Sequence, residues 1–360
     1  MHIGPHVLHG RALLAPMAGL SDQPFRNICR SFGAALAVSE MSIADTRLWH
    51  SRKSGTRLDF QGENGLRVLQ IAGSEPTQLA EAARAAAGLG ADIVDINMGC
   101  PAKKVCKKLS GSALLKDELL VSRILEAVTS ACKLPVTLKM RTGWAPDNRN
   151  GVRIAKIAEA AGIAALAVHG RTRACMFHGK AEYNTIREIK SAVSIPVFAN
   201  GDIVSARKAS EVLLATGADA VMIGRGALGR PWIFHELNHS LDEQLAGENL
   251  TNGSVSLQAQ RDTIVQHLNA LHQLYGEDRG VRVGRKHLTW YCKYLKGSTE
   301  FRKQIVRIES AEHQLHLTMD FLDKFQDLQE TLEQSEYSRN KVFSAKENIK
   351  KESVSSQTEG

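Results

Sequence analysis

The residue with the clearest chemical potential is Cys100, a thiol that follows a buried apolar run. It lies in the segment DINMGCP at residues 95–101, and lysines follow it at 103, 104, 107 and 108. A thiol near its usual pKa of about 8.5 is mostly protonated at neutral pH and can serve as a general acid. The lysines favour the thiolate, whereas an apolar surrounding favours the thiol. The sequence alone leaves that balance open.

Polar side chains also stand at the ends of the other apolar runs. They are Gln70, Asn97, Lys139, Arg141, His169, Arg171, Asn200, Asp202 and Arg225. Each of them alone has a structural explanation, because a single amide at a strand end often bonds a loop and a single lysine often reaches solvent. Polar groups at the ends of six runs together predict a binding or catalytic site.

The elements that position these groups are eight short apolar runs, each closed by Gly, Asn or Pro. The runs are Ala12–Gly19, Ala35–Met41, Leu66–Gly73, Asp92–Cys100, Pro135–Gly143, Ala165–Thr172, Pro196–Ile203 and Ala220–Leu228. The segments between them, such as 76–88, 117–132 and 205–216, carry apolar residues at helical spacing. Eight βα units predict an α/β fold, a TIM (β/α)8 barrel. A doubly wound sheet usually has five or six strands and leaves two runs unexplained.

Two of the predicted loops have special features. Pro101–Lys116, behind Cys100, is enlarged and predicts a lid, because barrel active sites lie on the loops that follow the strands. The glycine-containing turns at 200–202 and 224–225 predict a phosphate site built from backbone N–H groups, with Arg225 adding charge-assisted hydrogen bonds.

Composition limits the remaining possibilities. The 360 residues are 43% hydrophobic and carry a net charge of +8, which suits two domains and an anionic partner. We expect no signal peptide, no membrane span and no metal site, because no cationic apolar leader, long apolar run or Cys-x-x-Cys spacing is present. We expect a cytoplasmic protein whose six cysteines are reduced.

Beyond Pro231 the pattern becomes helical. Long amphipathic helices are predicted at Leu257–Tyr275 and Ile308–Leu332, with a shorter one at Lys286–Tyr294. We therefore predict a barrel domain at 1–240, a helical domain at 241–332 and a polar, disordered tail at 333–360.

The predicted helical domain contains a cluster of positive charge. Its members are Arg279, Arg282, Arg285, Lys286, Lys293, Lys296, Arg302, Lys303 and Arg307, and Trp290, Tyr291, Tyr294 and Phe301 are interleaved with them. Arg282, Arg285, Lys286 and Lys293 fall on one broad helical face, which suits a phosphate backbone. The alternative is a solvated face over buried aromatic side chains.

Seven motifs, in order, resemble those of the tRNA-dihydrouridine synthase family. They are APMAG (15–19), QIAG (70–73), DINMGCP (95–101), KMRTGW (139–144), HGRTR (169–173), NGD (200–202) and GR (224–225). AKKV (102–105) and RPWIF (230–234) point to the B-type bacterial branch. The resemblance covers about residues 1 to 330 and leaves the polar tail without a counterpart.

The resemblance implies FMN-dependent reduction of uridine in tRNA to dihydrouridine, with NADPH as reductant, by a monomer. Cys100 would be the proton donor to uracil. The implied cofactor-binding residues are Pro16, Met17, Ala18, Gln70, Lys139, His169, Asn200, Gly201, Asp202, Gly224 and Arg225. The expected tRNA-binding residues are Asn97, Lys103, Lys104, Arg141, Arg171, Arg173, Arg282, Arg285 and Lys286.

Two other functions stay open at this level. One is an FMN barrel that acts on a small pyrimidine, although it leaves the basic helical segment unused. The other is an RNA-binding or folding factor that keeps an inactive barrel. Cys106 also raises the possibility of a disulfide with Cys100 under oxidation, against the simpler interpretation of a neutral substitution in a loop.

Overall fold

A curled parallel sheet organises the first part of the chain. The computed structural model describes residues 1–107, 109–246 and 254–326. The sheet has the order β4-β3-β11-β10-β9-β8-β7-β6-β5, and all neighbours pair in parallel. The strands are β3 (Ala12–Leu14), β4 (Leu36–Ala37), β5 (Ser42–Ile43), β6 (Val68–Ala72), β7 (Ile93–Met98), β8 (Val136–Arg141), β9 (Ala165–His169), β10 (Val197–Asn200) and β11 (Ala220–Ile223).

The sheet closes because β4 and β5 are two parts of one strand position. β4 pairs with β3 and β5 pairs with β6. Between them Val38 forms a parallel bridge to Val68, and the Ser39 N–H donates to the Val68 carbonyl at 3.0 Å. The eight predicted runs therefore occupy the eight strand positions of a barrel, and the predicted TIM-barrel class is confirmed.

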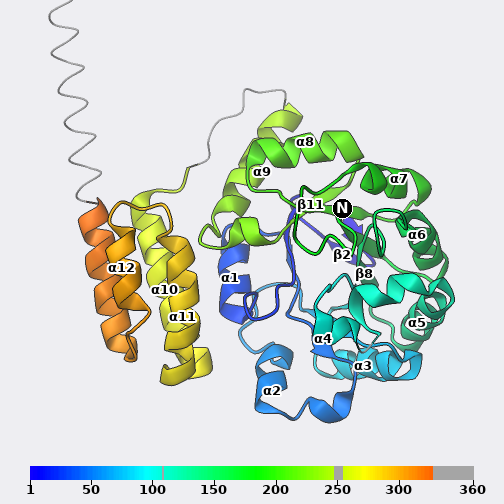
Figure 1. Cartoon of the computed structure of the whole chain (residues 1–360), viewed down its shortest axis with the longest axis horizontal. Coiled ribbons are helices and arrows are strands. Elements are labelled where there is room, and N and C mark those ends of the chain that lie inside the picture. The colour runs from blue at the N-terminus through cyan, green and yellow to red at the C-terminus, as the bar shows by residue number, and fades with distance from the viewer. Residues whose placement is uncertain (108, 247–253, 327–360) are drawn as a thin grey trace, which may run out of the picture. The chain divides into compact units, whose positions relative to one another are not determined.

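Helices surround the strands, as Figure 1 shows. They are α1 (Gln23–Ser31), α2 (Arg52–Leu58), α3 (Pro76–Gly88), α5 (Glu118–Ala131), α6 (Gly151–Ala160), α7 (Asn184–Ala192), α8 (Ala206–Thr216) and α9 (Ile233–Ala246). Short helical turns on the loops are η1 (Thr46–Leu48), α4 (Lys103–Cys106), η2 (Gly111–Lys116) and η3 (Arg225–Ala227). Local signals set the ends: the Ser205 hydroxyl caps α8 at the Lys208 N–H, and Gly217 ends it with a φ of 66°.

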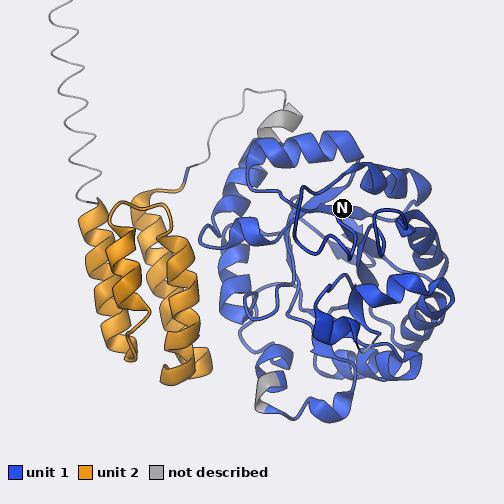
Figure 2. Ribbon diagram, viewed as in Figure 1, with its two compact units in different colours: residues 1–254 blue, residues 255–360 orange. Residues whose placement is uncertain are grey.

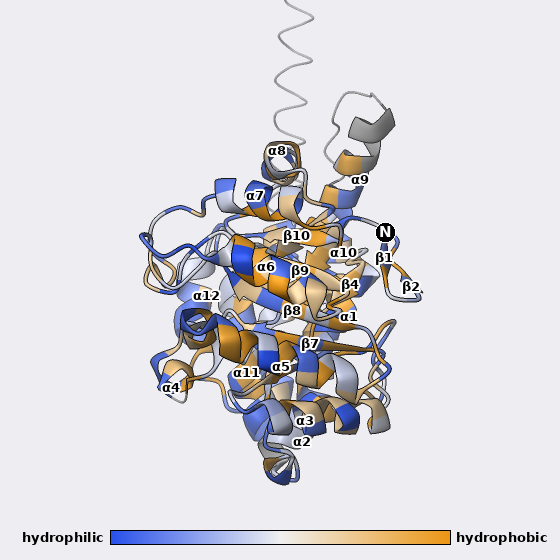
Figure 3. Ribbon diagram, turned by 90° about the vertical axis from the view of Figure 1, so that its right-hand side faces the viewer, coloured by the Kyte–Doolittle hydropathy of each residue, from blue (hydrophilic) through white to orange (hydrophobic). Residues whose placement is uncertain are grey.

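Alternation along the strands divides the apolar residues into two cores. Val94 and Ile96 of β7 pack outward against the helices, whereas Ile93 packs inside the barrel. The interior is closed by the hairpin of β1 (His2–Ile3) and β2 (His6–Val7), whose Ile3 is fully buried. Figure 3 shows hydrophobic residues concentrated on the strands and mixed character on the helices around them. This alternation decides which polar side chains can reach the barrel mouth.

The chain divides into one unit of Met1–Ser254 and a second that begins at Val255, as coloured in Figure 2. The boundary predicted after residue 240 falls inside α9. The second unit contains α10 (Leu257–Tyr275), α11 (Glu277–Tyr291), α12 (Ser298–Ile305) and helical residues 311–326. The tail predicted at 333–360 lies outside the described residues. No helix within the described ranges is long and apolar enough to cross a membrane.

Helix α11 begins at Glu277, before the helix predicted at Lys286–Tyr294. Its first part contains two glycines, which lie where α11 packs against α10. A Cβ on Gly280 would lie 2.8 Å from the Cα of His272, and one on Gly284 would lie 3.0 Å from Leu268 Cδ2. Both contacts are with α10, so the glycines allow the two helices to approach closely. Glycine weakens a helical pattern in sequence, which explains the shorter prediction.

Candidate active site

The inward positions of the strands bring the predicted polar residues together at the carboxyl end of the barrel. On β7, Asp95 and Asn97 lie two and four residues after Ile93, so their side chains point to the barrel interior as that of Ile93 does. Strand pairing places Asn97 opposite Lys139 and places His169 opposite both Arg141 and Asn200. Barrel active sites lie at this end of the strands.

A chain of hydrogen bonds runs beneath Cys100. Asn97 Oδ1 accepts from the Cys100 N–H at 3.0 Å, and Asn97 Nδ2 donates to Gln70 Oε1 at 2.8 Å. Gln70 Nε2 in turn donates to Asp95 Oδ2 at 2.7 Å, and the Thr137 hydroxyl donates to Asp95 Oδ1 at 2.6 Å. The buried network fixes the amide orientations of Gln70 and Asn97, and through them the backbone of Cys100.

Asp95 is a buried residue of this network that the sequence interpretation did not place in the site. It is buried, and burial raises its pKa to about 6 against the hydrogen bonds from Thr137 and Gln70. The available signal was a carboxylate at an inward position in an otherwise apolar strand. Such a group is rarely buried without partners.

The loop after β7 holds Cys100 closely against η2. The Cys100 carbonyl accepts from the Ser112 N–H at 3.1 Å and from the Ser112 hydroxyl at 2.9 Å. Gly111 has a φ of 63°, and a Cβ there would lie 2.8 Å from the Cys100 oxygen. The backbone that carries the thiol is therefore fixed by main-chain and hydroxyl contacts.

Burial raises the pKa of the Cys100 thiol, while the Ala102 N–H and the more distant charges of Arg141 and Lys139 oppose this rise. The thiol is thus protonated at neutral pH, as a general acid requires. Lys103 and Lys104 lie on α4 with exposed side chains. Burial therefore shifts the balance that the sequence left open toward the thiol.

Cys106 lies near the same loop without a covalent link to it. All six cysteines are free, and the Cys106 sulfur lies 3.7 Å from the carbonyl oxygen of Cys100. Among the described residues, no group of three or more His, Cys, Asp or Glu side chains could hold a metal ion.

Lys139 and His169 lie on β8 and β9, the two strands that follow β7 in the sheet. Lys139 Nζ donates to Asn200 Oδ1 at 3.1 Å, and Asn200 Nδ2 donates to the Met222 carbonyl at 2.7 Å. Burial lowers the pKa of Lys139 to about 8, so the amine stays mostly charged at neutral pH. Burial also lowers the pKa of His169 to about 2, so its imidazole is neutral.

Arg141 and Arg171 connect the loops at the barrel mouth. Arg141 donates to the carbonyls of Gly99 at 2.7 Å, Thr172 at 2.9 Å and Met176 at 2.7 Å. Arg171 is buried and forms two bonds to the Asp202 carboxylate, at 2.9 and 2.7 Å. Their guanidinium groups bind protein acceptors, so both residues fix the shape of the mouth.

Glycine turns and the positively charged Arg225 lie at the ends of β10 and β11. Gly201 has a φ of 130°, and a Cβ there would lie 2.8 Å from Ala181 Cβ. The side chain of Arg225 is 60% exposed and reaches Asp202 at 3.4 Å. A Cβ on Gly224 would lie 3.8 Å from the sulfur of Met17, within the loop in which Pro16 is partly buried and Ala18 is exposed. The glycine turns and the exposed Arg225 side chain thus lie together at this edge of the mouth, where the sequence predicted a phosphate site.

The basic residues predicted in the second unit have different environments. Arg282 and Lys286 are exposed on α11, whereas Arg285 Nε donates to the Ile308 carbonyl at 3.0 Å. The aromatic residues also divide. Tyr291 and Phe301 are buried in the helical core, whereas Tyr294 is 86% exposed.

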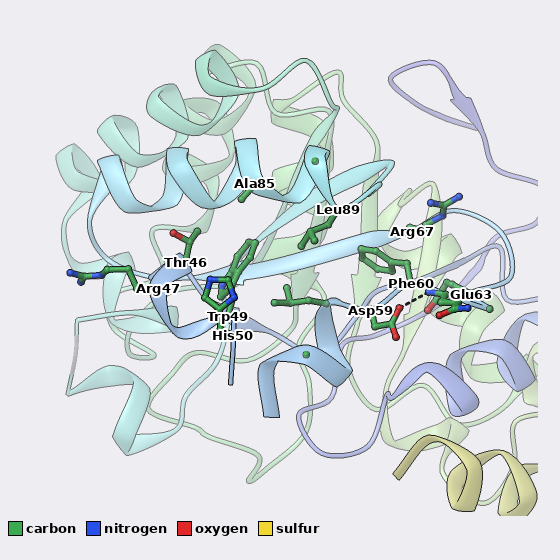
Figure 4. A pocket seen from close by; sticks show the side chains of 15 residues that line it. Thr46, Arg47, Trp49, His50, Asp59, Phe60, Glu63, Arg67, Ala85 and Leu89 are labelled. Carbon is green, nitrogen blue, oxygen red and sulfur yellow. Dashed lines mark hydrogen bonds between the residues drawn. The ribbon is translucent and has the colours of Figure 1, made fainter. Parts of the chain in front are cut away.

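A cavity of about 980 Å³ lies apart from these residues, between η1, α2 and the end of α3. Figure 4 shows Trp49, Phe60 and Leu89 on its walls, with Arg47 and Arg67 near its rim. None of the predicted site residues lines it. The chemistry argued from the sequence therefore belongs to the barrel mouth.

The fold and the mouth together define a parallel barrel with a half-buried thiol, a buried lysine and a network of buried polar side chains at the carboxyl end of its strands. The family model described as dihydrouridine synthase matches residues 13–330, and the chain belongs to this family. It is similar to tRNA-dihydrouridine synthase B of Pseudomonas aeruginosa, with 56% identity over 314 residues, which cover 87% of this chain and 93% of the relative. It is 56% identical to the protein of that name from Xanthomonas axonopodis pv. citri over 323 residues, covering 90% of this chain and 96% of the relative. It is 52% identical to the one from Shewanella oneidensis over 324 residues, covering 90% and 99%. The resemblance stated from the motifs is confirmed.

Proposed function

We propose that the protein is an FMN-dependent tRNA-dihydrouridine synthase, which reduces uridines in tRNA to 5,6-dihydrouridine with NADPH and uses Cys100 as the proton donor. The observation that carries this proposal is the position of Cys100 at the barrel mouth on a hydrogen-bonded backbone, where burial raises the pKa of its thiol. Family membership and the names of the relatives supply the reaction class.

The residues at the mouth fit a flavin mononucleotide. The ends of β10 and β11 offer the exposed guanidinium of Arg225 and the glycine backbone of Gly201 and Gly224, which suit a phosphate. Lys139 and His169 would lie beside the ring system, and Gln70 would contact its polar edge. Pro16, Met17 and Ala18 would line it through their loop, and Asn200 and Asp202 would keep Lys139, Arg171 and Arg225 in place.

Each side chain has a separate part in the proposed reaction. FMN, when bound and reduced by NADPH, supplies the two-electron chemistry. The Cys100 thiol donates a proton to the uracil ring and is regenerated from solvent. Lys139 places a positive charge where negative charge accumulates, and neutral His169 adds no second charge. Asn97 would orient both the Cys100 backbone and the uracil edge.

The partner in this proposal is tRNA. A uracil within folded RNA must leave its stack to reach the base of a barrel mouth. Four basic side chains are exposed and can bind tRNA phosphates without leaving a buried position in the protein. They are Lys103, Lys104, Arg282 and Lys286. Because tRNA is the proposed substrate, we also propose a cytoplasmic location. We predict that the protein is a monomer.

Absorbance and turnover test this function together. The purified chain should be yellow with oxidised FMN and should oxidise NADPH slowly alone and faster with unmodified tRNA. Acceleration by free uracil or dihydroorotate instead of tRNA would assign the barrel to a small pyrimidine. A colourless chain that takes up no FMN would refute the proposal.

A further inference from the structure

Two cations share one aromatic ring at the barrel mouth. The Lys116 amine lies 4.0 Å from the centre of the Trp144 ring, and the Arg173 guanidinium lies 4.8 Å from it. Lys116 ends η2, Trp144 follows β8 and Arg173 follows β9. The cluster is therefore built from three successive loops on the catalytic side of the barrel.

The backbone around this cluster is fixed. The Arg173 N–H donates to the Gly143 carbonyl at 3.0 Å, and the Ala174 N–H donates to the Trp144 carbonyl at 2.9 Å. A Cβ on Gly143 would lie 2.2 Å from the Asn148 oxygen, so glycine is needed for the turn that presents Trp144. The indole is thus held at a defined place and not on a free loop.

Arg141 places the cluster close to Cys100. Its guanidinium donates both to the carbonyl of Gly99, the residue before Cys100, and to the carbonyl of Thr172, the residue before Arg173. The main chains that carry the thiol and the Arg173 cation thus meet at a single side chain. A nucleotide whose base lies at Cys100 has its own phosphates within reach of this region.

The charge on the cluster is not neutralised by acidic residues. Within the described ranges, neither Lys116 nor Arg173 forms an ion pair, and the buried Nε of Arg173 has no hydrogen-bond acceptor. Arg171, two residues earlier, has its donors satisfied by Asp202 and backbone carbonyls. A π face attracts a cation but does not cancel its charge, so the two cations remain available to an anion.

We propose that Lys116 and Arg173, held by Trp144, form a binding subsite for a backbone phosphate of tRNA next to the uridine that is reduced. The inference rests on the proposed function, because it assigns the tRNA contact of that same site. A planar guanidinium and a mobile ammonium together suit a tetrahedral phosphate. The subsite would hold the strand while the base enters the barrel, and it would fix the register of the substrate.

Binding of unmodified tRNA at several salt concentrations tests the subsite. Lys116→Gln and Arg173→Gln should each raise the KM for tRNA roughly five- to tenfold, with the loss in KM and not in kcat. The double variant should lower the slope of log affinity against log salt by about 0.7 to 0.9, the contribution of one phosphate. Lys156→Gln, which removes an exposed charge on the outer helix α6, should leave both quantities as in the wild type.

The opposite results are equally specific. An unchanged KM and salt slope in the double variant would overturn the subsite and leave the cluster as a cross-link between loops. Loss of FMN from the variants would also overturn it, because the cations would then serve the cofactor. Lys116 is exposed, so Lys116→Gln removes one charge of the subsite without disturbing the core. This single variant tests the subsite even if Arg173→Gln disturbs folding. The affinity for tRNA can be measured directly, without turnover, so it tests the subsite by itself. A wild type that binds tRNA but forms no dihydrouridine would refute the proposed function and leave the subsite standing.

Discussion

Replacement of Asp95 with asparagine should stabilise the barrel at neutral pH and change the pH dependence of catalysis. Asparagine fits the same hydrogen bonds, because its carbonyl can accept from Gln70 Nε2 and its amide can donate to the Thr137 hydroxyl. The change therefore removes the buried charge and keeps the network beneath Cys100.

The size of the effect follows from the pKa of Asp95. Burial raises that pKa from 3.8 to about 6, a difference worth about 3 kcal/mol between the two protonation states. Because the folded pKa is the higher one, the protonated carboxyl contributes stability that is present below the unfolded pKa and is lost as the pH rises through about 6. Asp95→Asn should thus raise the free energy of unfolding by up to about 3 kcal/mol near pH 7.5, and by only about 1 kcal/mol near pH 4.5.

Catalysis should respond through Lys139. The charge of Asp95 raises the pKa of Lys139, so its removal lowers that pKa further below about 8 and moves the alkaline limb of the rate profile to lower pH. Asp95→Ala is the matched contrast, because it leaves the donors of Gln70 and Thr137 buried without an acceptor at about 1–3 kcal/mol each. The alanine variant should lose stability and kcat together.

Urea unfolding at two pH values and a pH–rate profile are the assays. An Asp95→Asn protein that unfolds like the wild type at both pH values, with the same alkaline limb, would refute the reasoning. It would mean that the carboxylate is already neutral or well solvated in the folded chain.

Three further predictions concern the helical unit and the loop after β7. Gly284→Ala should destabilise the helical unit by about 1–3 kcal/mol in thermal unfolding, because the added Cβ would lie 2.7 Å from Gln314 Oε1. The stability of the helical unit should fall as the pH drops below about 6.5, since burial lowers the pKa of His267 and His287. His287 alone should cost this unit about 2 kcal/mol near pH 5 in urea unfolding followed by a probe in the unit. Combined Lys103→Glu and Lys104→Glu should weaken tRNA binding at least tenfold while FMN content per chain stays constant, because both side chains are exposed beside Cys100.

Controls and contrary outcomes differ for these three. Gly88→Ala, at an exposed helix end with open space around it, should be neutral or slightly stabilising. Equal stability of the helical unit at pH 5 and 7.5 would show that the histidines are not held neutral in its core. Equal loss of tRNA and FMN binding in the lysine variant would assign those lysines to the fold or the cofactor.

The barrel was predictable because its signals are local and repeated. Eight apolar runs closed by Gly, Asn or Pro need no long-range information, and the structure places a strand at each of them. Gln70, Asn97 and Lys139 lie at inward positions near the ends of their strands, which is why polar residue types at strand ends indicated the mouth.

The remaining features depend on contacts between segments that are distant in sequence. The sequence offers only the carboxylate of Asp95 in an apolar run, and its partners Gln70 and Thr137 are identified only by the structure. The length of α11 was underestimated because Gly280 reads as a helix breaker until α10 is packed against it. The raised pKa of Cys100 required burial by residues that no spacing reveals.

The central claim is that the Cys100 thiol is the proton donor to a uracil in tRNA. Unmodified tRNA should be incubated with FMN, NADPH and either the wild type or Cys100→Ala, and dihydrouridine should then be measured by mass spectrometry. The account predicts dihydrouridine with the wild type and at least a hundredfold less with the variant, while both bind FMN and tRNA equally. Dihydrouridine formed by Cys100→Ala at the wild-type rate would contradict it.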